Sequence, residues 1–99
     1  MKLRQIAHSR TGDKGDTSNI SVIAFDPKDY RLLVERVTAE RVAAHFVAIA
    51  TGPVARYEMP NVSALNFVIE GALSGGVTRA LTLDAHGKSL SSLMLDLEI

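Results

Sequence analysis

The residues best suited to chemistry lie in one polar run near the start of the chain, residues 9–17, which directly follows His8. Two glycines in this run allow a ligand to approach the backbone closely. Two basic side chains can hold an anionic group, and a histidine can transfer a proton near neutral pH. The run therefore predicts an anion-binding loop beside a proton-transfer group. The candidate catalytic residues are His8, Asp13 and Lys14, and the candidate ligand-binding residues in and beside the loop are Arg10, Gly12, Gly15, Asp16 and Asn19.

The same run also fits a purely structural turn. Its two acidic and two basic side chains cancel in charge, and the carboxylates of Asp13 and Asp16 can accept hydrogen bonds from backbone N–H groups. The spacing over residues 12–18 lacks the G-x-x-x-x-G-K-[ST] pattern of a P-loop, and both aspartates would repel a phosphate. The two carboxylates could ligate Mg²⁺ or Ca²⁺, but no cage of further oxygen ligands accompanies them. We predict neither a bound metal ion nor a cofactor.

Two residues further along the chain interrupt apolar patterns. Helical spacing over residues 61–73 puts Asn66 inside an apolar arc, where an unpaired amide would cost about 1–3 kcal/mol. Asn66 is therefore expected to hold either backbone or a ligand. Arg79 falls on the core side of an alternating strand over residues 77–84, so its guanidinium needs an internal ion pair, an edge position that reaches water, or a bound anion. Both residues are added to the candidate ligand site.

The elements that would position these residues follow from hydrophobic spacing and end signals. Strands are expected at 3–8, 19–25 and 54–59, and a closing hairpin at 77–84 and 89–97. The pair Asp26-Pro27 starts one helix, Thr38 caps a second that ends before Gly52-Pro53, and a third is expected over 61–73. This order predicts an α+β fold of two layers. A mixed or antiparallel sheet of about five strands would carry the helices on one face.

Length and composition bound the class of protein. The 99 residues suit one domain, and 11 basic residues balance 11 acidic ones, which argues against a nucleic-acid partner. The chain has no cysteine, so thiolate chemistry and disulfides are excluded. No apolar run approaches the roughly 20 residues of a membrane span, and the first ten residues lack the apolar stretch of a secretory signal. We expect a cytoplasmic protein with no membrane association.

Three blocks of sequence carry a family resemblance. They are residues 6–16 (IAHSRTGDKGD) continuing through Asn19-Ile20, then Arg56-Tyr57 with Pro60 and 64–67, and finally 75–76 with Asp84, 87–88 and 95–99. With these blocks the chain resembles, over nearly its whole length, the small domain of the acyclic terpene utilisation (AtuA-like) family. The chain departs from the family pattern at Thr11, Ser21 and Ala80, where Ser, Gly and Ser are usual, and Ala80 leaves no catalytic hydroxyl at its position.

The resemblance implies a ferredoxin-like fold, from which the extra first strand departs. It also implies a partner, because the domain in this family is a C-terminal appendage to a larger domain or a separate small chain associated with it. The implied context is bacterial breakdown of acyclic terpenes or related branched acids as CoA thioesters.

Three hypotheses follow for this chain. The leading one is an accessory subunit, in a homo- or hetero-oligomer, that binds a larger AtuA-like protein and contributes to a shared site for an acyl-CoA or another anionic small molecule. A rival is a small stand-alone lyase or hydratase with His8 or Asp13 as base and Arg10 or Lys14 holding the anionic group. The third is a structural oligomerisation domain.

Overall fold

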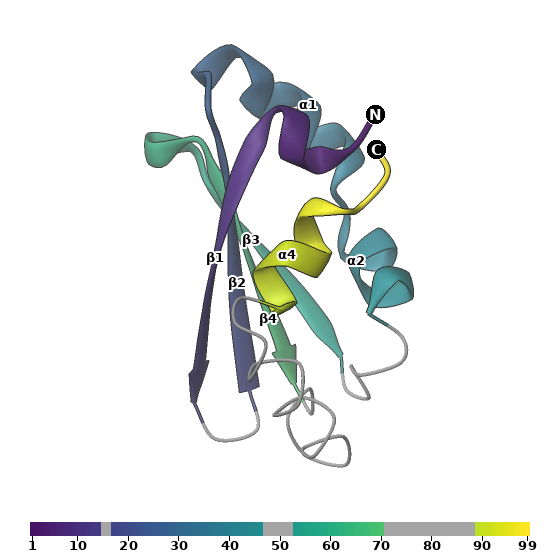
Figure 1. Ribbon diagram of the computed structural model, residues 1–99. Helices are drawn as coiled ribbons and strands as arrows, with labels where there is room; N and C mark the ends of the chain where they lie inside the picture. Colours follow the sequence, from purple (N-terminus) through teal and green to yellow (C-terminus); the bar gives the residue numbers. More distant parts are fainter. Residues whose placement is uncertain (15–16, 47–52, 71–88) are drawn as a thin grey trace.

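A four-stranded antiparallel sheet forms the frame of the described part of the chain (Figure 1). The computed structural model describes residues 1–14, 17–46, 53–70 and 89–99. In chain order the elements are η1 (Leu3–Gln5), β1 (Ala7–Lys14), β2 (Thr17–Ala24), η2 (Pro27–Asp29), α1 (Tyr30–Arg36), α2 (Ala39–His45), β3 (Val54–Met59), η3 (Pro60–Val62), β4 (Ala64–Glu70) and α4 (Ser89–Leu95).

The polar run over residues 9–17 is mostly strand, so the prediction of a loop there is wrong. β1 and β2 pair from Ala7 opposite Ala24 to Lys14 opposite Thr17, which leaves only residues 15 and 16 outside the pairing and outside the described part. Ser9 and Thr11 lie opposite the buried residues Val22 and Ile20 of β2, so the two faces of the strand are set by this pairing. An ideal Cβ on Gly12 would meet no atom within 4 Å, so this glycine occupies an ordinary, open strand position.

Residues 64–70 form β4, so the predicted third helix over 61–73 is wrong. Val62, Leu65 and Ile69 fit helical spacing, but Leu65, Phe67 and Ile69 also fit period two, and all three of these are buried. Aromatic and β-branched residues favour the strand. The single turn η3 and the left-handed backbone of Ser63 (φ 55°) fold the chain back so that β4 pairs with β3.

The C-terminal segment is a helix where a strand was predicted. Residues 89–95 form α4, and Leu93, Met94 and Leu97 pack on the core at helical spacing. The first strand of the predicted hairpin, 77–84, lies outside the described residues.

The predicted strand over 3–8 is wrong for residues 3–5, which form the single turn η1 because Gln5 N and Ile6 N donate back to Lys2 O and Leu3 O, and β1 begins only at Ala7. The two remaining helices and two remaining strands are confirmed in type. The helix α1 follows the Asp26-Pro27 start, Thr38 Oγ1 accepts a hydrogen bond from Arg41 N (3.1 Å) at the start of α2, and β3 has its predicted bounds.

The strand order β1-β2-β4-β3 explains how this arrangement is ferredoxin-like. β2 and β3 run parallel, with β4 between them, and the helices α1 and α2 make the connection, which is a split βαβ unit. If β1 is moved from the start of the chain to its end, the elements follow one another along the chain as βαββαβ. The described residues therefore contain an α+β, two-layer ferredoxin-like fold with four strands rather than about five.

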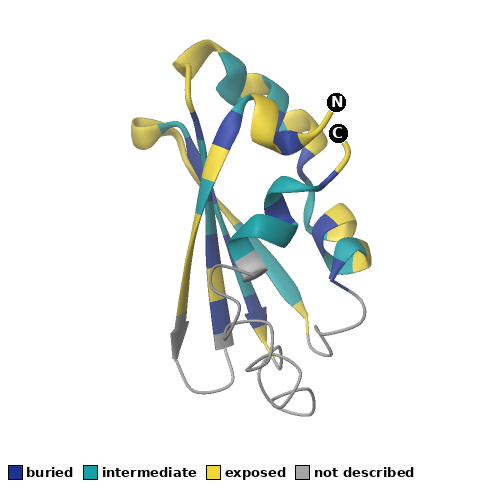
Figure 2. Ribbon diagram, in the orientation of Figure 1, coloured by how far each residue is buried: buried dark blue, intermediate teal, exposed yellow. Residues whose placement is uncertain are grey.

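The helices lie on one side of the sheet and bury its apolar face (Figure 2). β2 and β4 occupy the two central positions in the sheet, and buried and more accessible residues alternate along β2 from Ser18 and along β4 from Leu65. The buried core residues are Leu3, Ala7, Ile20, Val22, Ala24, Leu33, Val37, Val42, Phe46, Leu65, Phe67, Ile69, Met94 and Leu97. No helix among the described residues is long and apolar enough to cross a membrane.

Arg56 ties the helical layer to the sheet. Its Nη1 atom donates hydrogen bonds to the carbonyl oxygens of Val34 (2.8 Å) and Val37 (3.0 Å), at the C-terminal end of α1. Carbonyls at a helix end lack partners within the helix, and a cation there interacts favourably with the helix dipole. The Arg56 side chain is only 22% exposed, and its hydrogen bonds to α1 stabilise the packing of this helix on the sheet.

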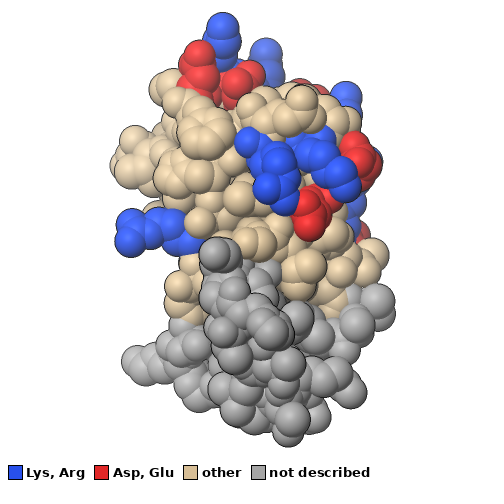
Figure 3. Space-filling view, in the orientation of Figure 1, with Lys and Arg blue, Asp and Glu red and all other residues tan. Residues whose placement is uncertain are grey.

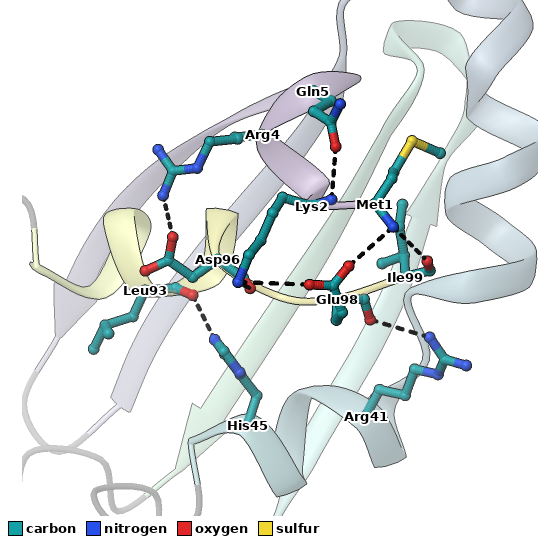
Figure 4. A network of polar contacts seen from close by, with 10 residues as sticks. All are labelled: Met1, Lys2, Arg4, Gln5, Arg41, His45, Leu93, Asp96, Glu98 and Ile99. Carbon is teal, nitrogen blue, oxygen red and sulfur yellow. Dashed lines mark hydrogen bonds and ion pairs between the residues drawn. The ribbon is translucent and has the colours of Figure 1, made fainter.

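The two chain ends are held together on the helix side (Figure 4). Leu3 N donates to Leu97 O and Ile99 N to Met1 O, each at 2.9 Å, so the ends pair as short antiparallel segments. Arg41 Nη1 donates to Glu98 O at 3.2 Å, and Arg4 forms an ion pair with Asp96. On the face drawn in Figure 3, basic and acidic side chains lie beside one another and do not separate into patches of one sign.

The Arg4–Asp96 pair predicts a loss of stability in acid. The hydrogen bond from Arg4, assisted by the positive charges of Arg4 and Lys2, lowers the pKa of Asp96 below its ordinary value. A lowered pKa stabilises the fold above the unfolded-state pKa of about 3.9, and this contribution is lost as the pH falls through the folded-state pKa. Asp96→Asn is therefore expected to lower the melting temperature at pH 7 and to have a smaller effect near pH 2.5, measured by circular dichroism. An equal decrease at both pH values would contradict this assignment.

Candidate functional site

One side of the sheet carries none of the described helices, and we call it the open face (Figure 1). Alternation along each strand decides which residues it contains, because Ile20 and Val22 of β2 turn into the core and their neighbours turn away. The described side chains of the open face are His8, Arg10, Asn19, Ser21, Ile23, Phe25, Ala55, Tyr57, Met59, Ala64, Asn66, Val68 and Glu70, together with Gly12.

Four candidate side chains from separate parts of the sequence meet on this face. His8 and Arg10 come from β1, Asn19 from β2 and Asn66 from β4, and Gly12 lies in the same surface opposite Asn19. His8, Arg10 and Asn19 are exposed. Of the other candidates, Asp13 and Lys14 belong to β1 but their side chains lie outside the described part, as do Gly15, Asp16 and Arg79 entirely.

A line of polar residues crosses all four strands at the middle of the open face. Arg10 lies opposite Ser21, Ser21 opposite Asn66, and Asn66 opposite Tyr57. With neighbouring strands about 4.8 Å apart, the backbones of Arg10 and Tyr57 are about 14 Å from each other. We refer to these four residues as the polar row.

Asn66 is the centre of the polar row, and its surroundings differ from those expected on a helix. The side chain is partly buried rather than enclosed, and Ser21 Oγ donates to its Oδ1 atom at 3.4 Å. No other hydrogen bond to its side chain occurs among the described residues. The expectation of a buried amide is therefore wrong, because β4 turns Asn66 away from the core, and its NH₂ group remains available to a ligand or partner.

Aromatic and apolar side chains lie in and beside the polar row. His8 stacks on Phe25, with ring centroids 5.4 Å apart and an interplanar angle of 20°. Phe25 is 63% exposed, Tyr57 55% and Met59 43%, so a large apolar area meets solvent here. These three residues were not predicted from the sequence to belong to the site. Alternation over 54–59 indicates that Tyr57 and Met59 share a side, but only the pairing with β4 shows that this side is open.

The whole chain, residues 1–99, matches the family model described as the AtuA ferredoxin-like domain. The chain belongs to this family. No curated protein and no solved structure matches it significantly. The family resemblance and the ferredoxin-like fold predicted from the sequence are thus both confirmed, and the open face is a surface of an AtuA ferredoxin-like domain.

The chemistry of the open face of this AtuA domain favours hydrogen-bond acceptors. Arg10, the Asn66 amide and the Tyr57 hydroxyl can all donate, and Arg10 forms no ion pair with any described residue. The one described acidic residue on the face, Glu70, lies four residues along β4 from Asn66, about 13 Å away. The described residues contain no group of three or more side chains that could hold a metal ion. A carboxylate or phosphate is the kind of group that the polar row could bind.

Proposed function

We propose that this AtuA ferredoxin-like domain is an accessory subunit that docks its open face on a larger AtuA-like chain and contributes the polar row to a shared anion-binding site. One observation carries the proposal. Residues selected for their chemistry from three separate strands occupy one surface, His8, Arg10, Asn19 and Asn66.

The composition of the open face supports docking to a protein. Aromatic residues, methionine and arginine are enriched at protein interfaces, and exposed Phe25, Tyr57 and Met59 with Arg10 match that enrichment. Leaving the exposed apolar area of these three side chains in water is also unfavourable. Association with a second chain would remove this area from solvent.

The exposure of the polar row favours a shared site over a stand-alone active site. A group bound by Arg10 and Asn66 would stay in contact with water, which weakens electrostatic interactions with it. A second chain seated on the open face would exclude that water and strengthen the same hydrogen bonds. The metabolic context, breakdown of acyclic terpenes or branched acids as CoA thioesters, comes from the family resemblance, and thioesters of CoA carry the phosphates that such a row could bind.

Reversing the charge of Arg10 tests the proposal. Arg10→Glu is expected to weaken binding to the larger AtuA-like chain of the same organism at least about tenfold, since arginines in interface centres often contribute more than 1 kcal/mol. Isothermal titration calorimetry on the purified chains measures the affinity. Arg31→Glu is the matched control, because Arg31 is also exposed but lies on α1, on the opposite side of the sheet.

The outcomes separate the candidate functions. Equal affinities of Arg10→Glu, Arg31→Glu and the unaltered chain would place the interface elsewhere and overturn the docking proposal. Absence of any binding to the larger chain, with turnover of acyl-CoA thioesters by the isolated domain, would replace it with the stand-alone lyase or hydratase.

A further inference from the structure

β3 is an edge strand whose outer backbone has no partner among the described residues. The strand order puts β3 at one end of the sheet, paired only with β4. An open edge offers a row of N–H and C=O groups to any other strand. Pro53 and Pro60 bracket the strand and lack N–H groups, so the edge available for pairing is short, residues 54–59.

The pairing with β4 determines which backbone groups of β3 point outward. Glu70 N donates to Pro53 O at 3.1 Å, and these two residues are opposite each other in the β3–β4 register. Hydrogen-bonded and non-hydrogen-bonded pairs alternate in an antiparallel ladder, so positions 55, 57 and 59 bond to β4. Val54, Arg56 and Glu58 therefore present their N–H and C=O groups to the outer edge, where no described strand lies.

The side chains of β3 are self-complementary in one antiparallel register. When two copies are related by a two-fold axis at Tyr57, Arg56 of each copy lies opposite Glu58 of the other, and the two tyrosines face each other. Ala55 lies opposite Met59, a small residue against a large one. A register centred on residue 56 would oppose two arginines, and one centred on 58 would oppose two glutamates. Cross-strand pairs of opposite charge and of aromatic rings stabilise a sheet, whereas like charges destabilise it.

We infer that two copies of this chain pair through their β3 edges, antiparallel and centred on Tyr57, to form one continuous eight-stranded sheet. In this register the outward groups of Arg56 and Glu58 make two hydrogen bonds at each of two symmetric positions. The backbone pattern permits this register and also those centred on residues 56 and 58, and the charge pattern selects it from among the three. The other edge strand, β1, has no equivalent, since its basic residues at positions 8, 10 and 14 never oppose Asp13 in a symmetric antiparallel pair.

The side chains of β3 are placed to serve this dimer. Glu58 is 53% exposed, and its carboxylate lies 3.3 Å from Nη2 of Arg56 on the same strand. Nη1 of Arg56 donates hydrogen bonds to the carbonyl oxygens of Val34 and Val37, which hold the guanidinium in position. Nη2 is the atom that points to Glu58. The dimer would cover exposed area on Tyr57 and Met59. Because one strand pair buries little area, we expect a weak, concentration-dependent dimer.

The inference goes beyond the proposed subunit function and is compatible with it. β1 is the edge strand opposite β3, so pairing at the β3 edge leaves its residues His8 and Arg10 accessible to another chain. The two open faces become neighbours in one surface. Arg10→Glu should therefore leave self-association unchanged, so the failure of one proposal does not imply the failure of the other.

Cysteine cross-linking tests the register directly, because the chain contains no cysteine. Tyr57→Cys places its two copies opposite each other with Cα atoms about 4.5–5.5 Å apart, within the range of a disulfide. Met59→Cys is the matched control on the same strand and the same face. Its two copies would be four residues, about 13 Å, apart, too far for a disulfide. Ala55→Cys mixed with Met59→Cys should instead form the mixed dimer.

The expected result in a glutathione redox buffer is a dominant Tyr57→Cys dimer on a non-reducing gel, no Met59→Cys dimer, and a mixed 55/59 dimer. Equal cross-linking of all variants would indicate random collision and overturn the inference. Sedimentation equilibrium of the unaltered chain up to about 1 mM, a concentration at which a millimolar dissociation constant still leaves visible dimer, should show self-association. Glu58→Arg should weaken it at least about tenfold. A strictly monomeric unaltered chain would also overturn the proposal.

Discussion

Phe67→Ala is expected to lower the free energy of unfolding by about 3–5 kcal/mol. Phe67 lies on β4 in the middle of the sheet, is fully buried, and pairs across strands with Ile20 and Arg56. Removing its ring leaves a cavity that the neighbouring strands cannot close, because backbone hydrogen bonds hold them at fixed spacing. Natural domains have a free energy of unfolding of about 5–15 kcal/mol, so this single substitution removes a large fraction of the stability. Urea denaturation followed by circular dichroism measures the loss.

Val68→Ala is the matched control for Phe67→Ala. Val68 is the next residue on β4, but it belongs to the open face and is only partly buried. We expect it to cost about 1 kcal/mol or less. Similar losses at positions 67 and 68 would contradict the strand assignment, because only a strand separates consecutive residues onto opposite faces.

Arg56→Met is expected to have the second-largest effect, a loss of about 1.5–3 kcal/mol. Methionine keeps most of the apolar stem but removes the charged hydrogen bonds to Val34 and Val37. The carbonyls at the end of α1 then lose their partner, and the contact between the helical layer and β3 weakens. Urea denaturation gives the loss of stability, and hydrogen exchange should show faster opening of α1.

Arg56→Lys separates charge from geometry at the same position. Lysine keeps the positive charge near the helix end, but a single ammonium cannot reproduce the planar fork of arginine. We expect it to recover only part of the stability lost in Arg56→Met. If Arg56→Met were as stable as the unaltered chain, Arg56 would have no structural role at the end of α1.

The open face and the β3 edge give this domain two distinct surfaces for association. The first presents donors and aromatic rings, and the second presents backbone groups that no described strand pairs with, together with side chains of opposite charge at positions 56 and 58. The variants Arg10→Glu and Glu58→Arg address the two surfaces separately. An assembly in which a pair of small domains receives larger chains on its common open face would use both.

Local signals in the sequence sufficed for several elements. Asp26 with Pro27, and Thr38, are end signals that act within a few residues, so α1 and α2 could be predicted without knowledge of their neighbours. The alternation in β3 and the Pro53 and Pro60 breakers at its ends are equally local. The family resemblance and the α+β class also followed from the sequence.

The tertiary structure decided the elements whose apolar spacing fits two structures. Residues 64–70 form a strand because β2 and β3 both pair with them, and their backbone groups are satisfied across strands. Residues 89–95 form a helix that packs on the sheet and is held by the opposite end of the chain. Short apolar runs carry no information on which partner is present, and so period alone could not distinguish these cases.

For the candidate site too, the sequence alone determined one part and the tertiary structure the other. The residue types at positions 8, 10, 19 and 66 indicated donors and a proton-transfer group, and these types are a property of the sequence alone. Their meeting on one open face, beside Tyr57 and Phe25, depends on strand register, because a shift of one residue would turn each of them to the other side of the sheet. Register is set by contacts between strands far apart in the chain, which is why only the folded structure reveals the polar row.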